Sequence, residues 1–377
     1  MAERPIRMGM IGGGTEAFIG GVHRMAARLD DSMRLVAGAL SSTPARSMES
    51  GRALGLQPDR CYGTWSDMLA KEAALPEHER MEAVVIVAPN DVHAPAATAA
   101  LEAGFHVVCD KPLAVSTDEA DALVAAQQAS GRVFAVTYNY TGYPMVRQAR
   151  HVVRSGGIGA VRRVMVEYLQ GWLATPLEQS GHKQAGWRTD PARAGAGVLG
   201  DIGSHAENLM TFVTGLTASE ICSDVSTHVA GRAVEDDASV LLRFGGGAVG
   251  SLTASQVCPG SRNGLSLRIW GERGGLVWHQ ERPCELLQTS LEGPDVVHRA
   301  GDPELAPVAA DACRLPSGHP EGFIEAFANI YRGAAAAMRA GRDDGEAFGY
   351  PDVRDGARGV HFVAAALAAS GCGWTRV

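Results

Sequence analysis

The sequence predicts an α/β protein of two domains: a doubly wound parallel sheet over residues 1–138, and an α/β domain with a large, mainly antiparallel open sheet over residues 139–377. Three observations lead to this prediction. The 377 residues exceed the usual size of a single core. Apolar runs alternate with helical patterns in the first part of the chain, as they do in parallel sheets. In the second part, apolar residues recur at every second position with few helical patterns between them, which is typical of antiparallel sheets.

The first domain alternates strand and helix with short connections. Its clearest strand is the continuous apolar run AVVIVA, which is typical of a strand buried on both faces. The expected strands are 6–11, 34–40, 83–88, 107–109 and 133–137. The expected helices are 21–29, 44–54, 65–74, 95–103 and 117–130.

The second domain is expected to be built mainly from strands. These are 161–168, 239–244, 248–255, 265–270 and 275–279, with helices at 145–154, 321–340 and 353–369 and a proline-rich loop at 303–320. No helix pattern is near enough to cover one face of the sheet. We therefore expect that face to be buried in a homodimer or homotetramer.

Composition narrows the range of partners. A formal net charge of −8 argues against nucleic acid and anionic membranes, because both require basic surface. The seven cysteines are odd in number and include no C-x-x-C pair, so neither a disulfide framework nor a metal site is expected. The N-terminal apolar run is too short for a signal peptide, and no stretch reaches the ~20 apolar residues of a membrane span. We therefore expect a cytoplasmic protein with reduced thiols.

Glycines follow the first strand at the place where a doubly wound sheet binds a pyrophosphate. Gly12 and Gly14 occupy the first two positions of the G-x-G-x-x-G pattern, and Gly20 takes the third if residues 15–19 include an insertion. The N-terminal amides of the helix that follows favour an anion. A dinucleotide is the expected ligand.

The end of the second strand bears on the choice between NAD and NADP. NAD sites normally carry an acid there for the ribose hydroxyls, whereas this chain has Ser41, Ser42 and Arg46. These side chains suit the additional phosphate of NADP, although Arg46 is equally compatible with the solvent face of the next helix. The sequence predicts NAD or NADP, with a slight preference for NADP.

Two further segments carry groups suited to acid and base chemistry. Asp110 and Lys111 follow a buried strand, and Pro112 favours an extended conformation at Lys111, which aims the ammonium toward the ligand edge of the sheet. Asp201 and His205 are four residues apart on an expected helix and would share one face, where the carboxylate can orient the imidazole. The alternative for this pair is an N-capping Asp beside a structural His.

These segments together resemble the Gfo/Idh/MocA family of nicotinamide-dependent oxidoreductases in order and spacing. The matching segments are Gly12-Gly13-Gly14, the run from Ala88 to His93, the run from Ala103 to Ala114, Trp187-Arg188, and the run from Gly200 to His205. The resemblance covers nearly the whole chain. It implies an N-terminal Rossmann domain, a C-terminal domain with an often oligomer-forming sheet, and hydride transfer at a carbon of a sugar, inositol or related polyol.

The resemblance also implies roles for individual residues. Lys111 would contact the reacting hydroxyl, His205 would take its proton, and Asp201 would orient or assist. Further cofactor contacts would come from Pro89, Asn90, His93, Asp110 (where the family usually has Glu), Asn139, Trp187 and Arg188. The chain departs from the family pattern in its lengthened glycine loop, in Asp110, and in Tyr140, where many members carry Arg.

Substrate contacts are expected mainly from aromatic and polar side chains, which suit the apolar face and polar rim of a sugar ring. The candidates besides Lys111, Asp201 and His205 are Tyr138, Tyr140, Trp172, Lys183, Arg188 and Asn208, whereas Tyr143 and His182 are expected to be structural. The predicted function is an NAD(P)-dependent sugar or polyol dehydrogenase or reductase. The alternatives are a redox glycosidase that forms a transient keto-sugar and, less favoured, a sugar sensor without catalysis.

Overall fold

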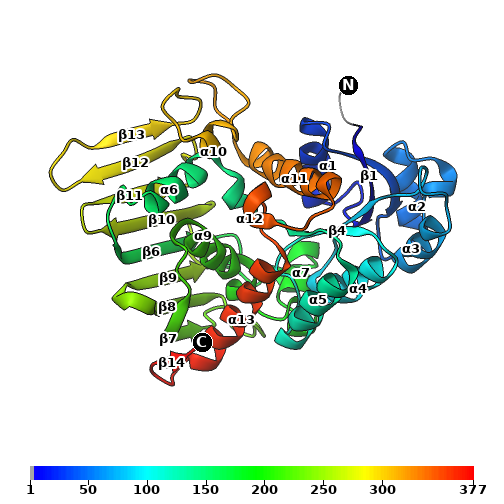
Figure 1. Cartoon of the computed structure of the whole chain (residues 1–377). Helices are drawn as coiled ribbons and strands as arrows, with labels where there is room; N and C mark the ends of the chain where they lie inside the picture. Colours follow the sequence, from blue (N-terminus) through cyan, green and yellow to red (C-terminus); the bar gives the residue numbers. More distant parts are fainter. Residues whose placement is uncertain (1–3) are drawn as a thin grey trace. The chain divides into compact units, whose positions relative to one another are not determined.

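Five parallel strands form the first sheet, in the order β2-β1-β3-β4-β5 (Figure 1). The computed structural model describes residues 4–377, so Met1 to Glu3, part of the segment judged too short for a signal peptide, lie outside the described residues. The strands are β1 (Ile6–Gly12), β2 (Met33–Ala39), β3 (Ala83–Val87), β4 (His106–Cys109) and β5 (Phe134–Val136). All five residues of β3 are buried, as its apolar sequence predicts for a strand covered on both faces. The doubly wound parallel sheet is thus confirmed.

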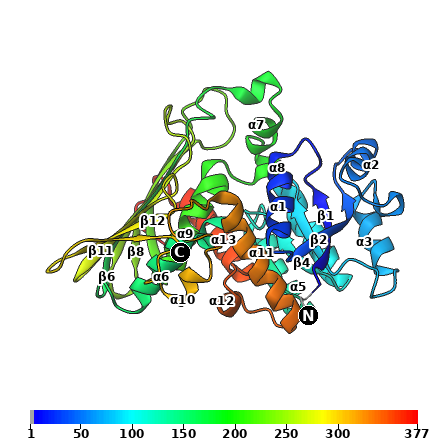
Figure 2. The same cartoon turned by 90° about the horizontal axis from the view of Figure 1, so that it is seen from above.

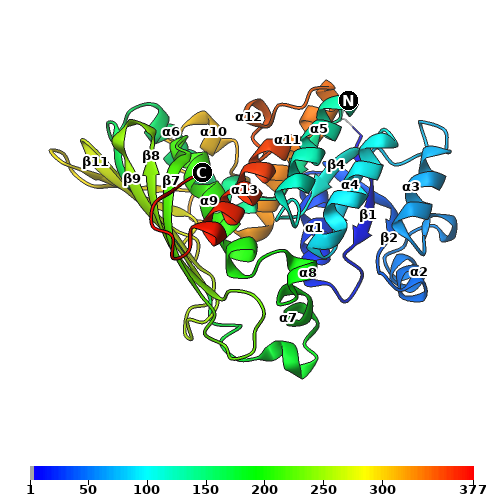
Figure 3. The same cartoon turned by 90° about the horizontal axis from the view of Figure 1, so that it is seen from below.

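Helices cover both faces of this sheet. They are α1 (Phe18–Leu29), α2 (Pro44–Ala53), α3 (Trp65–Ala73), α4 (His93–Glu102) and α5 (Thr117–Ser130). In Figure 3, α3, α4 and α5 lie side by side in front of the strands, with α1 behind them. The start of α5 is fixed by Ser116, whose hydroxyl accepts the Glu119 N–H at 3.3 Å. Helix α1 begins three residues before the expected position, because its glycines hid the helical pattern.

A late segment of the chain returns to the first sheet. The chain divides into one unit of residues up to Asn139 with Ile324–Ala357, and a second unit of Tyr140–Phe323 with Arg358–Val377. Helix α11 (Phe323–Ala340) packs on α1, where the His23 Nδ1 lies 2.8 Å from the Tyr331 hydroxyl. The sequence placed all residues after 138 in the second domain. The division therefore differs from that expectation over 324–357, because apolar and hydrogen-bonding partners for this segment lie in the first unit.

Nine strands form the second sheet, in the order β13-β12-β11-β10-β6-β9-β8-β7-β14. Neighbouring strands are antiparallel except for β6 and β9, which are parallel. The strands are β6 (Val161–Leu169), β7 (Ala218–Ser226), β8 (Asp237–Phe244), β9 (Val249–Ser255), β10 (Gly264–Gly271), β11 (Gly274–His279), β12 (Glu285–Ser290), β13 (Val296–Arg299) and β14 (Thr375–Arg376). The large, mainly antiparallel sheet is confirmed, although β7, β12, β13 and β14 were not predicted.

The helices of the second unit lie on one face of this sheet. Figure 2 shows α6 (Pro144–Arg154) and α9 (Ser204–Thr214) on that face, and no helix of the described second unit on the other. Shorter helices are α7 (Lys183–Arg188), α8 (Pro191–Ala194), α10 (Pro307–Ala310) within the expected loop, and α12 (Gly345–Phe348) in the first unit, while α13 (Val353–Ala369) spans the division. Within residues 4–377, no helix combines the length and the apolar character needed to cross a membrane.

Candidate functional site

The loop after β1 brings backbone very close to its neighbours. Gly12 and Gly13 have φ of +75° and +67°, a region that favours glycine. A Cβ on Gly12 would lie 2.6 Å from the Val87 carbonyl oxygen at the end of β3, and a Cβ on Gly20 would overlap the backbone of Gly13. Gly20 therefore permits close packing of α1 on this loop, which is the part expected of a third glycine. Gly14 contacts the end of β2 instead, where its N–H donates to the Leu40 carbonyl at 3.1 Å.

The end of β2 presents no carboxylate between Leu40 and Arg46. Ser41 accepts the Thr43 N–H through its hydroxyl at 3.2 Å, which shapes the turn into α2. Ser42 is exposed, and Arg46 is an exposed side chain in the first turn of α2. Both expected alternatives for Arg46, a phosphate contact and a solvated surface position, are compatible with this location.

Asp110 organises the backbone at the end of β4. One of its carboxylate oxygens accepts the Lys111 N–H at 2.9 Å and the Thr137 hydroxyl at 2.9 Å. Lys111 itself is half-buried, and its bond to Pro112 is cis. Because the Asp110 side chain bonds to both neighbouring strand ends, it fixes the backbone from which the Lys111 side chain extends.

His23 is a residue of this region that sequence analysis did not identify. It is fully buried on α1, where burial lowers its pKa to about 4, so the ring is neutral at pH 7. Its Nε2 lies 3.9 Å from Asp110 and its Nδ1 is held by Tyr331. The signal in the sequence is a histidine on the apolar face of a helix that includes Val22 and Ala26.

His93 ties two of the expected cofactor segments together. Its Nδ1 lies 2.8 Å from the Pro112 carbonyl and its Nε2 3.0 Å from the Ala88 carbonyl. Burial lowers the pKa of this imidazole. The ring thus braces the turn after Lys111 against the end of β3. Pro89 is half-buried and Asn90 buried directly after that strand.

Tyr138 and Asn139 are buried at the end of the first segment of this unit. The Asn139 amide nitrogen Nδ2 is buried and has no hydrogen-bond partner among residues 4–377. A buried donor without an acceptor is costly, so this amide is suited to a ligand oxygen.

In the second unit, Asp201 and His205 do not share one α-helix. Asp201 lies in a π-helical segment, Leu199–Gly203, and His205 in the first turn of α9. The helix expected from the sequence is therefore π-helical at Asp201 and α-helical at His205. Asp201 does not cap α9 either, since Gly203 occupies the N-cap position.

Asp201 is held from two other elements. Its Oδ2 accepts a hydrogen bond from Gln256 Nε2 at 2.8 Å and lies 3.4 Å from Arg188 Nε. The Arg188 guanidinium stacks over the Trp187 ring with 4.2 Å to the centroid. Arg188 was an expected site residue; Gln256 was not.

A chain of hydroxyl and amide groups runs from Tyr140 toward Asp201, and we call it the Tyr140 network. The Tyr140 and Tyr168 hydroxyls lie 2.6 Å apart, and Tyr168 donates to Asn263 Oδ1 at 2.7 Å. Gln170 donates to the same oxygen at 3.0 Å and accepts from Trp172 Nε1 at 3.0 Å. Burial raises the pKa of both tyrosines, so the hydroxyls remain protonated.

His205 borders this network. Its ring lies 4.7 Å from that of Tyr140 in an edge-to-face arrangement. One turn further along α9, the buried Asn208 Oδ1 has no hydrogen-bond partner among residues 4–377. Unfilled acceptor capacity beside a histidine is suited to a ligand that brings hydroxyl donors.

Family models match both halves of the chain. Residues 6–138 match an oxidoreductase family with an NAD-binding Rossmann fold, and residues 146–277 match the GFO/IDH/MocA C-terminal domain. The chain belongs to the Gfo/Idh/MocA oxidoreductase family. The resemblance seen in its motifs is thus confirmed.

Three relatives of this Gfo/Idh/MocA protein span most of its length. An uncharacterized oxidoreductase of Bacillus subtilis is 34% identical over 96% of this chain and 93% of its own length. The levoglucosan dehydrogenase of Pseudarthrobacter phenanthrenivorans is 29% identical over 74% of this chain and 75% of its own. An inositol dehydrogenase homolog of Azotobacter vinelandii, solved with NADH and myo-inositol, is 36% identical with a TM-score of 0.92, covering 99% of this chain and 98% of its own.

Lys183 and His182 of this Gfo/Idh/MocA protein do not hydrogen-bond to the Tyr140 network in the described part of the chain. Lys183 is exposed on α7, and no hydrogen bond or ion pair joins it to the network within residues 4–377. Tyr143 packs against Trp278 with 5.5 Å between ring centroids, and His182 accepts the Ala185 N–H at the start of α7. Tyr143 and His182 also border the network, since their rings lie 6.2 Å from those of Tyr140 and Trp172, respectively.

Proposed function

We propose that this chain is an NAD(P)-dependent dehydrogenase that oxidises a secondary hydroxyl of a sugar, inositol or related polyol. The observation that carries the proposal is the Tyr140 network beside His205. Its phenols and carboxamides are neutral donors and acceptors. Such groups suit a substrate that carries several hydroxyls better than a substrate that carries a carboxylate or a phosphate. One relative was solved with myo-inositol bound and another is named a levoglucosan dehydrogenase, which supports the same substrate class.

In this proposal, Lys111 and His205 act on one substrate hydroxyl. The Lys111 ammonium donates a hydrogen bond to the hydroxyl oxygen and stabilises the negative charge that develops there. His205 Nε2 takes the hydroxyl proton as general base. Asp201, itself held by Gln256 and Arg188, orients or assists this pair.

The first unit has the features needed for a nicotinamide dinucleotide. Gly12, Gly13 and Gly20 let the loop after β1 pack closely against the end of β3 and against α1, and the N-terminus of α1 that follows is suited to a pyrophosphate. The buried Asn139 amide offers a donor near the end of the sheet that carries Lys111. When bound, the nicotinamide supplies the acceptor for the hydride that leaves the hydroxyl-bearing carbon.

Arg46, Ser41 and Ser42 extend the proposal to NADP. There is no carboxylate at the end of β2 to repel a 2′-phosphate, and the exposed Arg46 lies in the first turn of α2, directly after this strand end. The Azotobacter vinelandii homolog was solved with NAD⁺ and with NADH, which supports use of the unphosphorylated cofactor as well. We therefore propose NAD or NADP, with Arg46 as the residue that determines affinity for the latter.

A substrate panel tests this function. The purified protein is incubated with inositols, sugars and anhydrosugars, each with NAD⁺ and with NADP⁺, while the absorbance of the reduced nicotinamide is followed. The proposal requires stoichiometric reduction of the cofactor by at least one polyol. Glycoside cleavage without net reduction would instead indicate a redox glycosidase, and saturable sugar binding without either reaction would indicate a sensor.

A further inference from the structure

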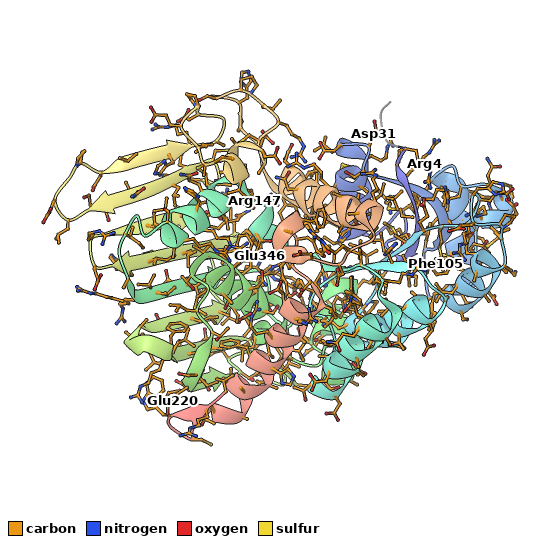
Figure 4. All side chains as sticks on the ribbon, in the orientation of Figure 1. Arg4, Asp31, Phe105, Arg147, Glu220 and Glu346 are labelled. Carbon is orange, nitrogen blue, oxygen red and sulfur yellow. The ribbon has the colours of Figure 1, made fainter. Side chains whose placement is uncertain are left out.

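A cavity of about 520 Å³ opens at the amino ends of the strands of the first sheet, opposite the carboxyl ends, which the glycine loop and Lys111 follow. Its walls come from the amino ends of β1, β3 and β4 and from the loops before β3 and β5. Arg4 and Phe105, which are labelled in Figure 4, both line it. Nothing in the proposed dehydrogenase chemistry uses this edge of the sheet.

The cavity is basic in a chain whose net charge is −8. Four arginines and two glutamates line it, a formal charge of +2 before its two histidines are counted. Glu82 is neutralised by Arg4, whose guanidinium donates to both carboxylate oxygens at 2.6 and 2.8 Å. Arg7 donates to the carbonyls of Arg80 and Glu77 at 2.6 and 2.8 Å. The charges of Arg4 and Glu82 therefore offset each other, and Arg7 is held by backbone carbonyls, so neither arginine is the main candidate for binding a ligand.

Two guanidinium groups remain available in the cavity. Arg80 lies over the ring of the buried Phe105 at 5.8 Å, and Arg132 flanks Gly104. Both are half-buried, and no carboxylate of residues 4–377 lies within ion-pair distance of either one. Half-buried arginines without counter-ions attract an anion, because their charges are only partly screened by water.

His106 adds a donor of defined direction. Its Nδ1 accepts the Val133 N–H at 2.9 Å, which leaves the proton of the neutral ring on Nε2. Burial and the nearby Arg132 lower the pKa of His106 to about 4. The ring is therefore a neutral N–H donor at pH 7, and a bound anion would stabilise its charged form.

We propose that this cavity binds the phosphate or diphosphate group of a small metabolite, with Arg80, Arg132 and His106 as its donors. Arginine forks match the oxygens of a phosphate group, and a cavity of this size has room for an organic portion beside Phe105. The glycine loop lies at the carboxyl ends of the strands of the same sheet. A ligand in the cavity and a dinucleotide at the glycine loop therefore do not compete.

Calorimetric titration of the full chain with inorganic pyrophosphate tests the proposal. The protein is first saturated with NADH, so that the glycine loop is not available to the probe. Separate titration with NADH alone establishes cofactor binding, so failure of the proposed function is recognised independently. We expect saturable pyrophosphate binding that weakens about tenfold or more in Arg80→Gln and in Arg132→Gln, as loss of a charge-assisted hydrogen bond implies.

Arg28→Gln is the matched control, because Arg28 is an exposed arginine of the same unit outside the cavity. Its affinity for pyrophosphate should equal that of the wild type, and thermal melting should show all three variants folded. Absence of saturable pyrophosphate binding to the NADH-saturated protein, or equal weakening in Arg28→Gln, would overturn the proposal.

Discussion

The edge of the Tyr140 ring packs against the His205 imidazole, with 4.7 Å between centroids and 70° between the planes. The Tyr140 hydroxyl is held separately by Tyr168 and Asn263. Tyr140→Phe removes only the hydroxyl, and a lost hydrogen bond of about 0.5–1.5 kcal/mol should lower kcat roughly 2- to 12-fold. Tyr140→Ala also removes the support of His205 and should lower kcat further. Steady-state rates of both folded variants provide the test, and equal losses would show that the ring does not position His205.

The uncovered face of the second sheet predicts self-association. The apolar residues Leu241, Val249 and Trp270 of the strands β8, β9 and β10 lie on this face. Their exposed fractions are 51%, 39% and 37%. Burial of this face between copies would remove apolar area from water at about 25 cal/mol per Å². Light scattering should therefore give a dimer or tetramer of the 39.5 kDa chain, and Leu241→Lys should shift it toward the monomer. A wild-type monomer at micromolar concentration would refute this expectation.

Arg46→Ala tests the cofactor preference. If Arg46 contacts a 2′-phosphate, the substitution should weaken NADP about tenfold or more and leave NAD almost unchanged, because only NADP carries that group. Affinities for both cofactors can be measured by fluorescence titration. Arg52→Ala, at the exposed last turn of the same helix, serves as the control. Small, equal effects on the two cofactors would place Arg46 on the solvent face.

His23 predicts a loss of stability in mild acid. Its pKa is about 4 in the folded chain against an ordinary value of 6.5, so below pH 6.5 the unfolded chain takes up the proton first. The free energy of unfolding should therefore fall as the pH drops from 6.5 toward 4, by about 2 kcal/mol at pH 5 from this residue. His23→Asn should be less stable at neutral pH but lose less on acidification. Denaturant titrations of the wild type and of His23→Asn at pH 7 and pH 5 measure the free energy of unfolding. An identical pH dependence in the two proteins would contradict the burial of a neutral His23.

The sequence predicts the first sheet well because its strands are continuous apolar runs. The strand β3 is buried on both faces, and its five residues can be read directly as such. The strand β7 was missed because small and charged residues replace the expected alternation, and its apolar residues Ala218, Ile221, Cys222 and Val225 do not recur at every second position. The strands β12 and β13 are short, and β13 is mostly exposed, so burial leaves little signal in their sequence.

Candidate site residues were predicted where they lie within one short motif. They were missed where residues distant in sequence come together only in the folded sheet. Asp110 and Lys111 follow a strand directly, so their placement depends on neighbouring residues alone. Tyr168, Asn263 and Gln256 come from separate strands or the loops next to them, and only the register of the sheet brings them into one network. The π-helical turn at Asp201 has no sequence signature to separate it from an α-helix.

The turnover of His205→Ala measures the proposed catalytic role most directly, in single-turnover reduction of NAD⁺ or NADP⁺ by the best polyol of the panel. We predict a 10²- to 10⁴-fold slower rate with cofactor affinity retained, as expected for loss of a general base, and at least as large a loss in Lys111→Ala. His319→Ala, at an exposed histidine of the loop after α10 that among residues 4–377 contacts only the Pro316 carbonyl, should react at the wild-type rate. Retention of more than about a third of the wild-type rate by His205→Ala would exclude His205 as the base.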